Sequence, residues 1–147
     1  MAIDVSVPRV ATAAAGSYSA VVHIRVLGPL EVARDGGEVA LGGRKQRTVL
    51  AVLVAELGRA VPVDALIDAV RGDEPTPGVR STLQTYVSNL RHELGDVIVR
   101  EAGGYRLQAD ASAVDAAVFE QEVVTASELA GRDPAGAALR FRAALSL

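Results

Sequence analysis

The chain has 147 residues and a net charge of −3, which suits one compact domain with a small appendage and argues against a nonspecific polycation. It has no cysteine and only two histidines, His23 and His92, which excludes disulfides and thiolate chemistry and argues against a metal site, so we expect no cofactor. No apolar run is long enough to cross a membrane and the N-terminus lacks a signal-peptide pattern, which predicts a cytoplasmic protein without a membrane partner.

The first part of the chain divides into a polar arm and a predicted sheet. Residues 1–20 are mostly small or polar, so we expect a flexible N-terminal arm. Enrichment in Val and Ile then predicts three short antiparallel strands, at Val22–Leu27, Leu30–Arg34 and Glu38–Leu41. The sequence Asp-Gly-Gly at 35–37 predicts the tight turn between the last two strands.

Apolar residues at helical spacing predict three helices after this sheet. The first covers Arg44–Leu57, and a short second helix follows Val61 and Pro62 and stops at Gly72. The third is the best marked, because Thr76 is a suitable N-cap, Pro77 fits the first turn and the apolar stripe continues to Leu94.

Two strands and two further helices complete the predicted elements. Strands at Val97–Arg100 and Tyr105–Gln108, joined by a Gly103–Gly104 turn, predict a hairpin, the wing. Beyond Asp110 the predicted helices are Val114–Leu129 and Pro134–Leu145, and Asp133 is placed to cap the second. This pair cannot bury both apolar faces alone, so it needs the rest of the chain, another copy or helices missing from this sequence.

The order of these elements predicts an α+β fold. An N-terminal antiparallel sheet, three helices and a C-terminal β-hairpin form a winged helix-turn-helix, which we place at residues 21–109. Residues 110–147 form the helical hairpin that follows it.

One face of the third helix has the chemistry of a DNA-reading surface. At about 100° per residue, hydroxyl and amide side chains lie opposite the leucine stripe, arginines flank them, and no carboxylate interrupts them. Such groups match phosphate oxygens and base edges in the major groove of double-stranded DNA. The candidate residues are Arg80, Ser81, Gln84, Thr85, Ser88, Asn89, Arg91 and His92. An ordinary solvated helix face is the alternative, and the helix-loop-helix-hairpin order favours DNA.

Two further groups of cations are candidates for DNA contact. Arg44, Lys45 and Arg47 begin the first helix, where the helix dipole disfavours cations, which suggests that they serve an external phosphate. Arg100 and Arg106 bracket the wing and could reach the neighbouring minor groove or the DNA backbone, although solvated arginines beside a packed Tyr105 are an equal alternative.

Other classes of function fit the residues less well. No nucleophile–base pair, metal set or phosphate loop can be assembled, which argues against an enzyme. The alternative to a DNA-binding regulator is a protein-interaction adaptor that uses the winged helix as a scaffold and the helical hairpin as the contact.

An ordered set of segments resembles the Streptomyces antibiotic regulatory protein family, whose DNA-binding part is similar to that of OmpR/PhoB-type response regulators. The segments are IRVLGPLEV, GGRKQRTVLAVLVAELGRAV, VDALIDAVRGDEP, STLQTYVSNLRHELG, GYRLQAD and VDAAVFE, which cover most of 24–120. The resemblance implies a nucleoid-associated transcriptional activator that binds promoter direct repeats as a head-to-tail dimer and recruits RNA polymerase holoenzyme. It makes the helix from Pro77 to Leu94 the recognition helix and implies polymerase contacts in the preceding loop, at Asp73, Glu74 and Thr76.

The resemblance also implies that residues 110–147 begin a helical-repeat bacterial transcriptional activator domain. The sequence departs from the family where Arg71 replaces the usual tryptophan and where Pro62 replaces a capping hydroxyl residue. The helical repeats stop after about one hairpin, so we expect either a fragment or a reduced member of the family.

Overall fold

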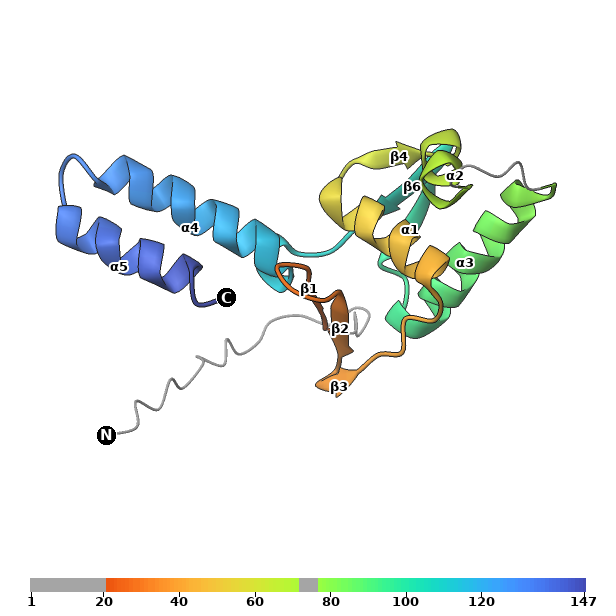
Figure 1. The fold of residues 1–147 in the computed structure, drawn as a ribbon, viewed down its shortest axis with the longest axis horizontal. Coiled ribbons are helices and arrows are strands. Elements are labelled where there is room, and N and C mark those ends of the chain that lie inside the picture. The colour runs from red at the N-terminus through yellow and green to blue at the C-terminus, as the bar shows by residue number, and fades with distance from the viewer. Residues whose placement is uncertain (1–20, 72–76) are drawn as a thin grey trace, which may run out of the picture.

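A three-stranded antiparallel sheet comes first in the computed structural model, which describes residues 21–71 and 77–147 (Figure 1). Its strands β1 (Val22–Arg25), β2 (Glu31–Arg34) and β3 (Gly37–Glu38) lie in the order β1-β2-β3. Val22, Ile24 and Val32 are buried on one side, as the alternation of the sequence requires. The predicted sheet is therefore correct, but each strand is shorter than expected, and the last turn consists of Asp35 and Gly36 while Gly37 pairs with Arg34.

Three helices pack on one another to form the core of the winged helix. They are α1 (Arg44–Ala55), α2 (Val63–Arg71) and α3 (Val79–Leu94). Their apolar stripes are buried as predicted, and burial of each large aliphatic side chain stabilises the fold by about 1.5–3 kcal/mol. The fully buried leucines of these three helices are Leu50, Leu53, Leu66, Leu83, Leu90 and Leu94.

The start of α3 differs from the prediction. The helix begins at Val79 rather than at Pro77, because Gly78 adopts a left-handed conformation with φ of 76° and interrupts the helical backbone before it. The hydroxyl of Ser81 donates a hydrogen bond of 2.7 Å to the Gly78 carbonyl. Gly78 is thus the N-cap, and the predicted cap Thr76 lies outside the described residues.

A second three-stranded sheet contains one strand that the sequence analysis missed. The strands β4 (Ala60–Pro62), β5 (Ile98–Glu101) and β6 (Gly104–Leu107) have the order β4-β6-β5. Val61 pairs with Tyr105 in this sheet, so β4 attaches the segment between α1 and α2 to the wing. The predicted wing turn is wrong by one residue: Glu101 pairs with Gly104, which leaves Ala102 and Gly103 as the turn.

The C-terminal helices form the predicted hairpin. A short 3-10 turn, η1 (Ala111–Ala113), leads into α4 (Asp115–Leu129), which packs on α5 (Pro134–Ala144). Asp133 caps α5 as predicted, accepting a hydrogen bond of 2.9 Å from the Gly136 amide. The hairpin extends from the winged helix at the end of the long axis opposite α3 (Figure 1).

The hairpin is attached to the first sheet at its base. Ile24 forms a parallel bridge with Val114, the residue before α4. The next residue, Asp115, accepts hydrogen bonds from the backbone amides of Val26 and Leu27 at 2.8 and 3.2 Å. Backbone and side chain thus both connect the N-terminal sheet to α4.

The sequence predictions that lie outside the described residues are the arm at 1–20, the N-cap Thr76, and the loop at 72–76 with its polymerase-contact candidates. Within 21–71 and 77–147, no helix is long and apolar enough to span a membrane. In the same ranges, no group of three or more metal-ligating side chains comes together.

Candidate nucleic-acid interface

The outer face of α3 is an exposed polar surface, as predicted. Leu83, Val87, Leu90 and Leu94 point into the core, so the opposite side of the helix faces solvent. From Val79 to His92 the helix has no carboxylate. We define its outer face by the exposed residues Arg80, Ser81, Gln84, Thr85, Ser88, Asn89 and His92.

A cluster of exposed cations lies beside this face, at the start of α1. We call Arg44, Lys45 and Arg47 the basic turn. The helices touch through Gln46, whose Oε1 accepts a hydrogen bond of 3.2 Å from Asn89 Nδ2. Arg47 already donates a 2.6 Å hydrogen bond to the Leu30 carbonyl, whereas neither Arg44 nor Lys45 forms an ion pair with a described residue. Two cations are therefore available next to the outer face.

Arg71 adds a third cation to this region, which the analysis of the sequence did not count. It lines a hollow of about 240 Å³ between α1 and α2 together with Arg44 and Lys45. This is the position where the resembling family has tryptophan, and its charge at the end of α2 is the signal that could have identified it. The site thus holds more positive charge than was predicted.

Two predicted contact residues on α3 are engaged within the chain. Arg91 is half-buried; its Nε donates a 2.7 Å hydrogen bond to the Ile98 carbonyl, and its guanidinium carbon lies 5.9 Å from the Tyr105 ring centroid. Arg91 therefore joins α3 to the wing. Arg80 lies 2.7 Å from Asp64 on α2, but the two side chains are 67% and 80% exposed, so water screens this pair.

The two predicted wing arginines have different surroundings. Arg100 is exposed, with its guanidinium carbon 6.0 Å from the ring centroid of the buried Tyr105. Arg106 is half-buried, and its Nε lies 2.7 Å from Glu101 Oε1 in an ion pair that lacks the alignment of a hydrogen bond. Arg100 is thus the wing cation that is available to an external phosphate.

Two residues that support α3 were not predicted. Arg34 on β2 donates a 3.0 Å hydrogen bond to the Glu93 carbonyl, which places a cation at the negative end of the helix dipole. Gln46 is only 7% exposed and is a buried polar residue between α1 and α3. Its position three residues before Val49 and four before Leu50, within the apolar stripe of α1, could have identified it from the sequence.

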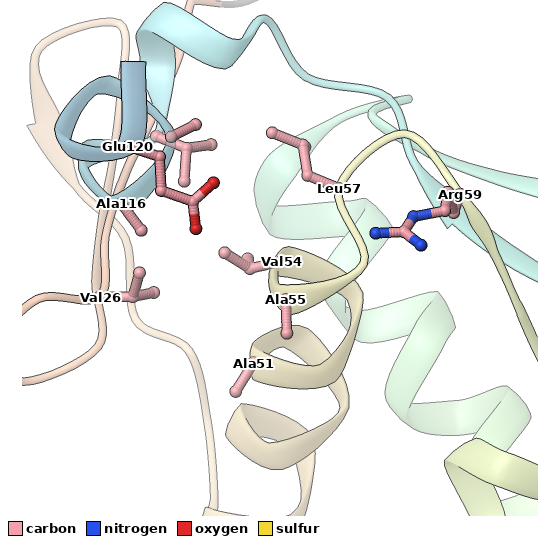
Figure 2. Close-up of a pocket in the computed structure, with 10 residues that line it drawn as sticks. Val26, Ala51, Val54, Ala55, Leu57, Arg59, Ala116 and Glu120 are labelled. Atoms are coloured by element: carbon pink, nitrogen blue, oxygen red, sulfur yellow. The ribbon is translucent and has the colours of Figure 1, made fainter. Parts of the chain in front are cut away.

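One hollow in the described structure lies away from α3. It has a volume of about 450 Å³ and is bounded by the end of β1, by α1 with the loop after it, and by the start of α4 (Figure 2). Ala51, Ala55 and Ala116 leave space in its walls, while Glu120 and Arg59 lie on opposite sides of it (Figure 2). This hollow is a feature of the hairpin junction and not of the outer face of α3.

Comparison with known proteins places this fold among transcriptional regulators. Residues 36–118 match the family described as "Transcriptional regulatory protein, C terminal". The chain is 41% identical over 104 residues to the transcriptional regulatory protein EmbR of Mycobacterium tuberculosis, covering 66% of this chain and 27% of EmbR. It is 36% identical over 141 residues to the regulatory protein DnrI of Streptomyces peucetius, covering 86% of this chain and 51% of DnrI.

A further relative and a solved structure agree with this placement. The regulatory protein AfsR of Streptomyces coelicolor is 36% identical over 113 residues, which cover 76% of this chain and 11% of AfsR. The structure "Mycobacterium tuberculosis EmbR in complex with low affinity phosphopeptide" matches with a TM-score of 0.79 at 35% identity, over 86% of this chain and 36% of that one. The chain thus spans about half the length of DnrI, 27% to 36% of EmbR and 11% of AfsR.

These relatives confirm the resemblance to the Streptomyces antibiotic regulatory proteins, the family to which AfsR, DnrI and EmbR belong. The match over residues 36–118 and the winged helix agree in identifying the type of domain. The chain belongs to the family of transcriptional regulators that carry an OmpR/PhoB-type winged-helix DNA-binding domain.

Proposed function

We propose that residues 21–109 bind double-stranded DNA in a sequence-specific manner, with α3 in the major groove. The observation that carries the proposal is the outer face of α3, which is exposed, free of carboxylates from Val79 to His92, and bordered by the basic turn of α1. A polyanion is attracted to this combination, and hydroxyl and amide groups along the helix match the hydrogen-bonding edges of bases.

The intramolecular contacts divide the candidate residues into three roles. The residues proposed to read bases or nearby phosphates are Ser81, near the start of the helix, and Gln84, Thr85, Ser88, Asn89 and His92. The proposed phosphate contacts are Arg44, Lys45, Arg80 and Arg100. Arg47, Arg91 and Arg106 already bind other groups of the chain, so their first role is to support the surface.

The finer parts of the proposal rest on the family resemblance. They are activation of transcription in the cytoplasm at nucleoid DNA, binding to direct repeats as a head-to-tail pair, and contact with RNA polymerase through Asp73, Glu74 and Thr76. Residues 110–147 would then be the first part of a helical-repeat domain. The likeness to AfsR and DnrI supports this extension of the DNA-binding role.

A fluorescence anisotropy titration at several salt concentrations tests DNA binding. The probe is a set of labelled duplexes selected from a random library by the full chain. Lys45→Ala should reduce the slope of log K against log salt by about 0.9, the value for one phosphate contact on duplex DNA. Arg142→Ala on α5 is the matched control, because it removes an exposed cation at the far end of the chain and should leave the slope unchanged.

Base reading is tested in the same assay with the double variant Thr85→Ala, Ser88→Ala. It should reduce the preference for selected over random duplexes while the salt slope stays near that of the parent chain. Absence of salt-dependent binding by the parent chain would sink the proposal. A stable protein complex that survives replacement of Lys45, Thr85 and Ser88 would favour the adaptor instead.

A further inference from the structure

The side-chain amide of Gln46 lies between α1 and α3. Gln46 is 7% exposed, so its amide is largely shielded from water. A Cβ on Gly42 would stand 2.9 Å from Gln46 Nε2 and 3.3 Å from Oε1, so the amide lies directly over the Gly42 backbone. Gln46 Oε1 accepts the hydrogen bond of 3.2 Å from Asn89.

This contact also determines how the exposed Asn89 presents its own amide. Asn89 Nδ2 carries two hydrogens, and one is donated to Gln46. A rotation of the Asn89 amide by 180° would bring its Oδ1 against Gln46 Oε1, so two acceptors would face each other. The hydrogen bond therefore fixes which end of the Asn89 amide faces α1, and leaves Oδ1 and the second Nδ2 hydrogen for another molecule.

The two remaining groups of Asn89, the acceptor Oδ1 and one donor N–H, complement the major-groove edge of one base. Adenine offers a donor at N6 and an acceptor at N7 in the major groove, which an asparagine satisfies with one oxygen and one N–H. Guanine offers two acceptors there, so Oδ1 would face an acceptor without a hydrogen between them. A phosphate would use the N–H alone and leave Oδ1 without a partner.

We propose that Asn89 is a base-reading residue for adenine and that Gln46 is its positioning residue, fixing the orientation of the Asn89 amide without touching DNA. The inference rests on the proposed function and adds to it the identity of one base and the residue that enforces it. Ser88, the neighbour of Asn89 on the outer face, has no hydrogen bond to Gln46 and is the matched control.

Selection of duplexes from a random library by the full chain and its variants tests both roles. Asn89→Ala should lower the preference for adenine at one motif position by roughly 5- to 150-fold, the range for a bidentate base contact. Gln46→Met removes the acceptor at similar side-chain length and should lower the preference at the same position by roughly 2- to 12-fold. Gln46→Glu keeps an acceptor oxygen and should retain the base preference even if its charge weakens binding to every sequence. Ser88→Ala should lower the preference at another motif position, as proposed above, and leave the adenine position unchanged, whereas Arg142→Ala on α5 should leave the whole motif unchanged.

A base analogue gives a second readout that does not depend on the Gln46 variants folding well. Replacing the selected adenine by 7-deazaadenine removes N7, and should weaken binding by the parent chain but not by Asn89→Ala. Thermal unfolding of each variant identifies a loss that is due to instability. An unchanged base preference in folded Gln46→Met would overturn the positioning role, and an unchanged motif in Asn89→Ala would overturn both roles while DNA binding stands. A parent chain that selects no motif would overturn the proposed function itself.

Discussion

Asp115 accepts a hydrogen bond of 2.8 Å from the backbone amide of Val26, a residue 89 positions earlier in the chain. The other carboxylate oxygen accepts from the amide of Leu27, and the first oxygen also accepts from the amide of Ala116. One side chain thus joins the loop after β1 to the first turn of α4. This contact is the main polar link between the N-terminal sheet and the hairpin among the described residues.

Replacing Asp115 by alanine should loosen this junction. The change leaves the Val26 amide, which is partly buried, without its acceptor, and we expect a loss of about 1–3 kcal/mol in the free energy of unfolding by urea. Hydrogen exchange at the amides of Val26 and Leu27 should accelerate. The matched control is Asp133→Ala, which removes the cap of α5 at a cost of about 1 kcal/mol and should leave those two amides protected. Equal exchange at Val26 in both variants would contradict the assignment.

Arg91 and Arg80 should respond differently to alanine substitution. Arg91→Ala removes a hydrogen bond from a half-buried cation to the Ile98 carbonyl, and we expect a loss of about 1.5–3 kcal/mol in the free energy of unfolding. Arg80→Ala removes only an exposed pair with Asp64 and should cost less than about 1 kcal/mol. Chemical denaturation of the two variants measures the difference. A larger loss for Arg80→Ala would contradict the supporting role given to Arg91.

The two glycines of the wing, Gly103 and Gly104, should also differ in their response to alanine substitution. A Cβ on Gly104 would collide with the Val61 carbonyl, so Gly104→Ala should separate β4 from β6 at a cost of about 1–3 kcal/mol. Gly103 has φ of 80° but nothing near its Cβ position, so Gly103→Ala should cost only the backbone strain, about 1 kcal/mol. Amide exchange at Val61 and Tyr105 distinguishes them: it should rise in the first variant, and a rise of the same size in the second would exclude the proposed collision.

Asp110 should titrate below the ordinary range for a carboxyl group. The hydroxyl of Ser112 and then its backbone amide donate hydrogen bonds to the carboxylate, and both lower the pKa of Asp110 from 3.8. Because folding favours the charged form, this contribution to stability is complete above pH 3.8 and disappears as the pH falls through the lower native pKa. An NMR titration of the Asp110 carboxyl carbon measures it. Ser112→Ala should raise the midpoint towards 3.8, and a midpoint at or above that value in the parent chain would contradict the contact.

The sequence was sufficient for the order and type of most elements because their signals are local. The leucine spacing of α3 determines both its core side and its outer face, and Asp133 with Pro134 marks the start of α5. The predicted start of α3 was wrong because a proline in the first turn is a common helix start. The helix instead begins after Gly78, whose left-handed backbone the sequence pattern does not reveal. Strand β4 was missed because three residues ending in proline become a strand only through pairing with β6.

The candidate site was only partly predictable because part of it depends on contacts between elements that are distant in the sequence. Periodicity correctly placed Gln84, Thr85 and Ser88 on the exposed side of α3. It could not show that Arg91 turns towards the Ile98 carbonyl, since that acceptor comes from the wing. Contacts between elements that are distant in the sequence decide which cations remain available, and they follow from the fold rather than from any local pattern.

The pairing of Val61 with Tyr105 also determines when the second sheet can form during synthesis. Synthesis on the ribosome proceeds from the N-terminus, and α3 is complete at Leu94 before any residue of β5 or β6 exists. Strand β4 then has no partner, and the leucine side of α3 lacks the wing that covers its end. The nascent chain therefore cannot complete the fold that supports the outer face of α3 until Leu107 has left the exit tunnel. A ribosome that stalls before that point would display the helix without the fold that orients it.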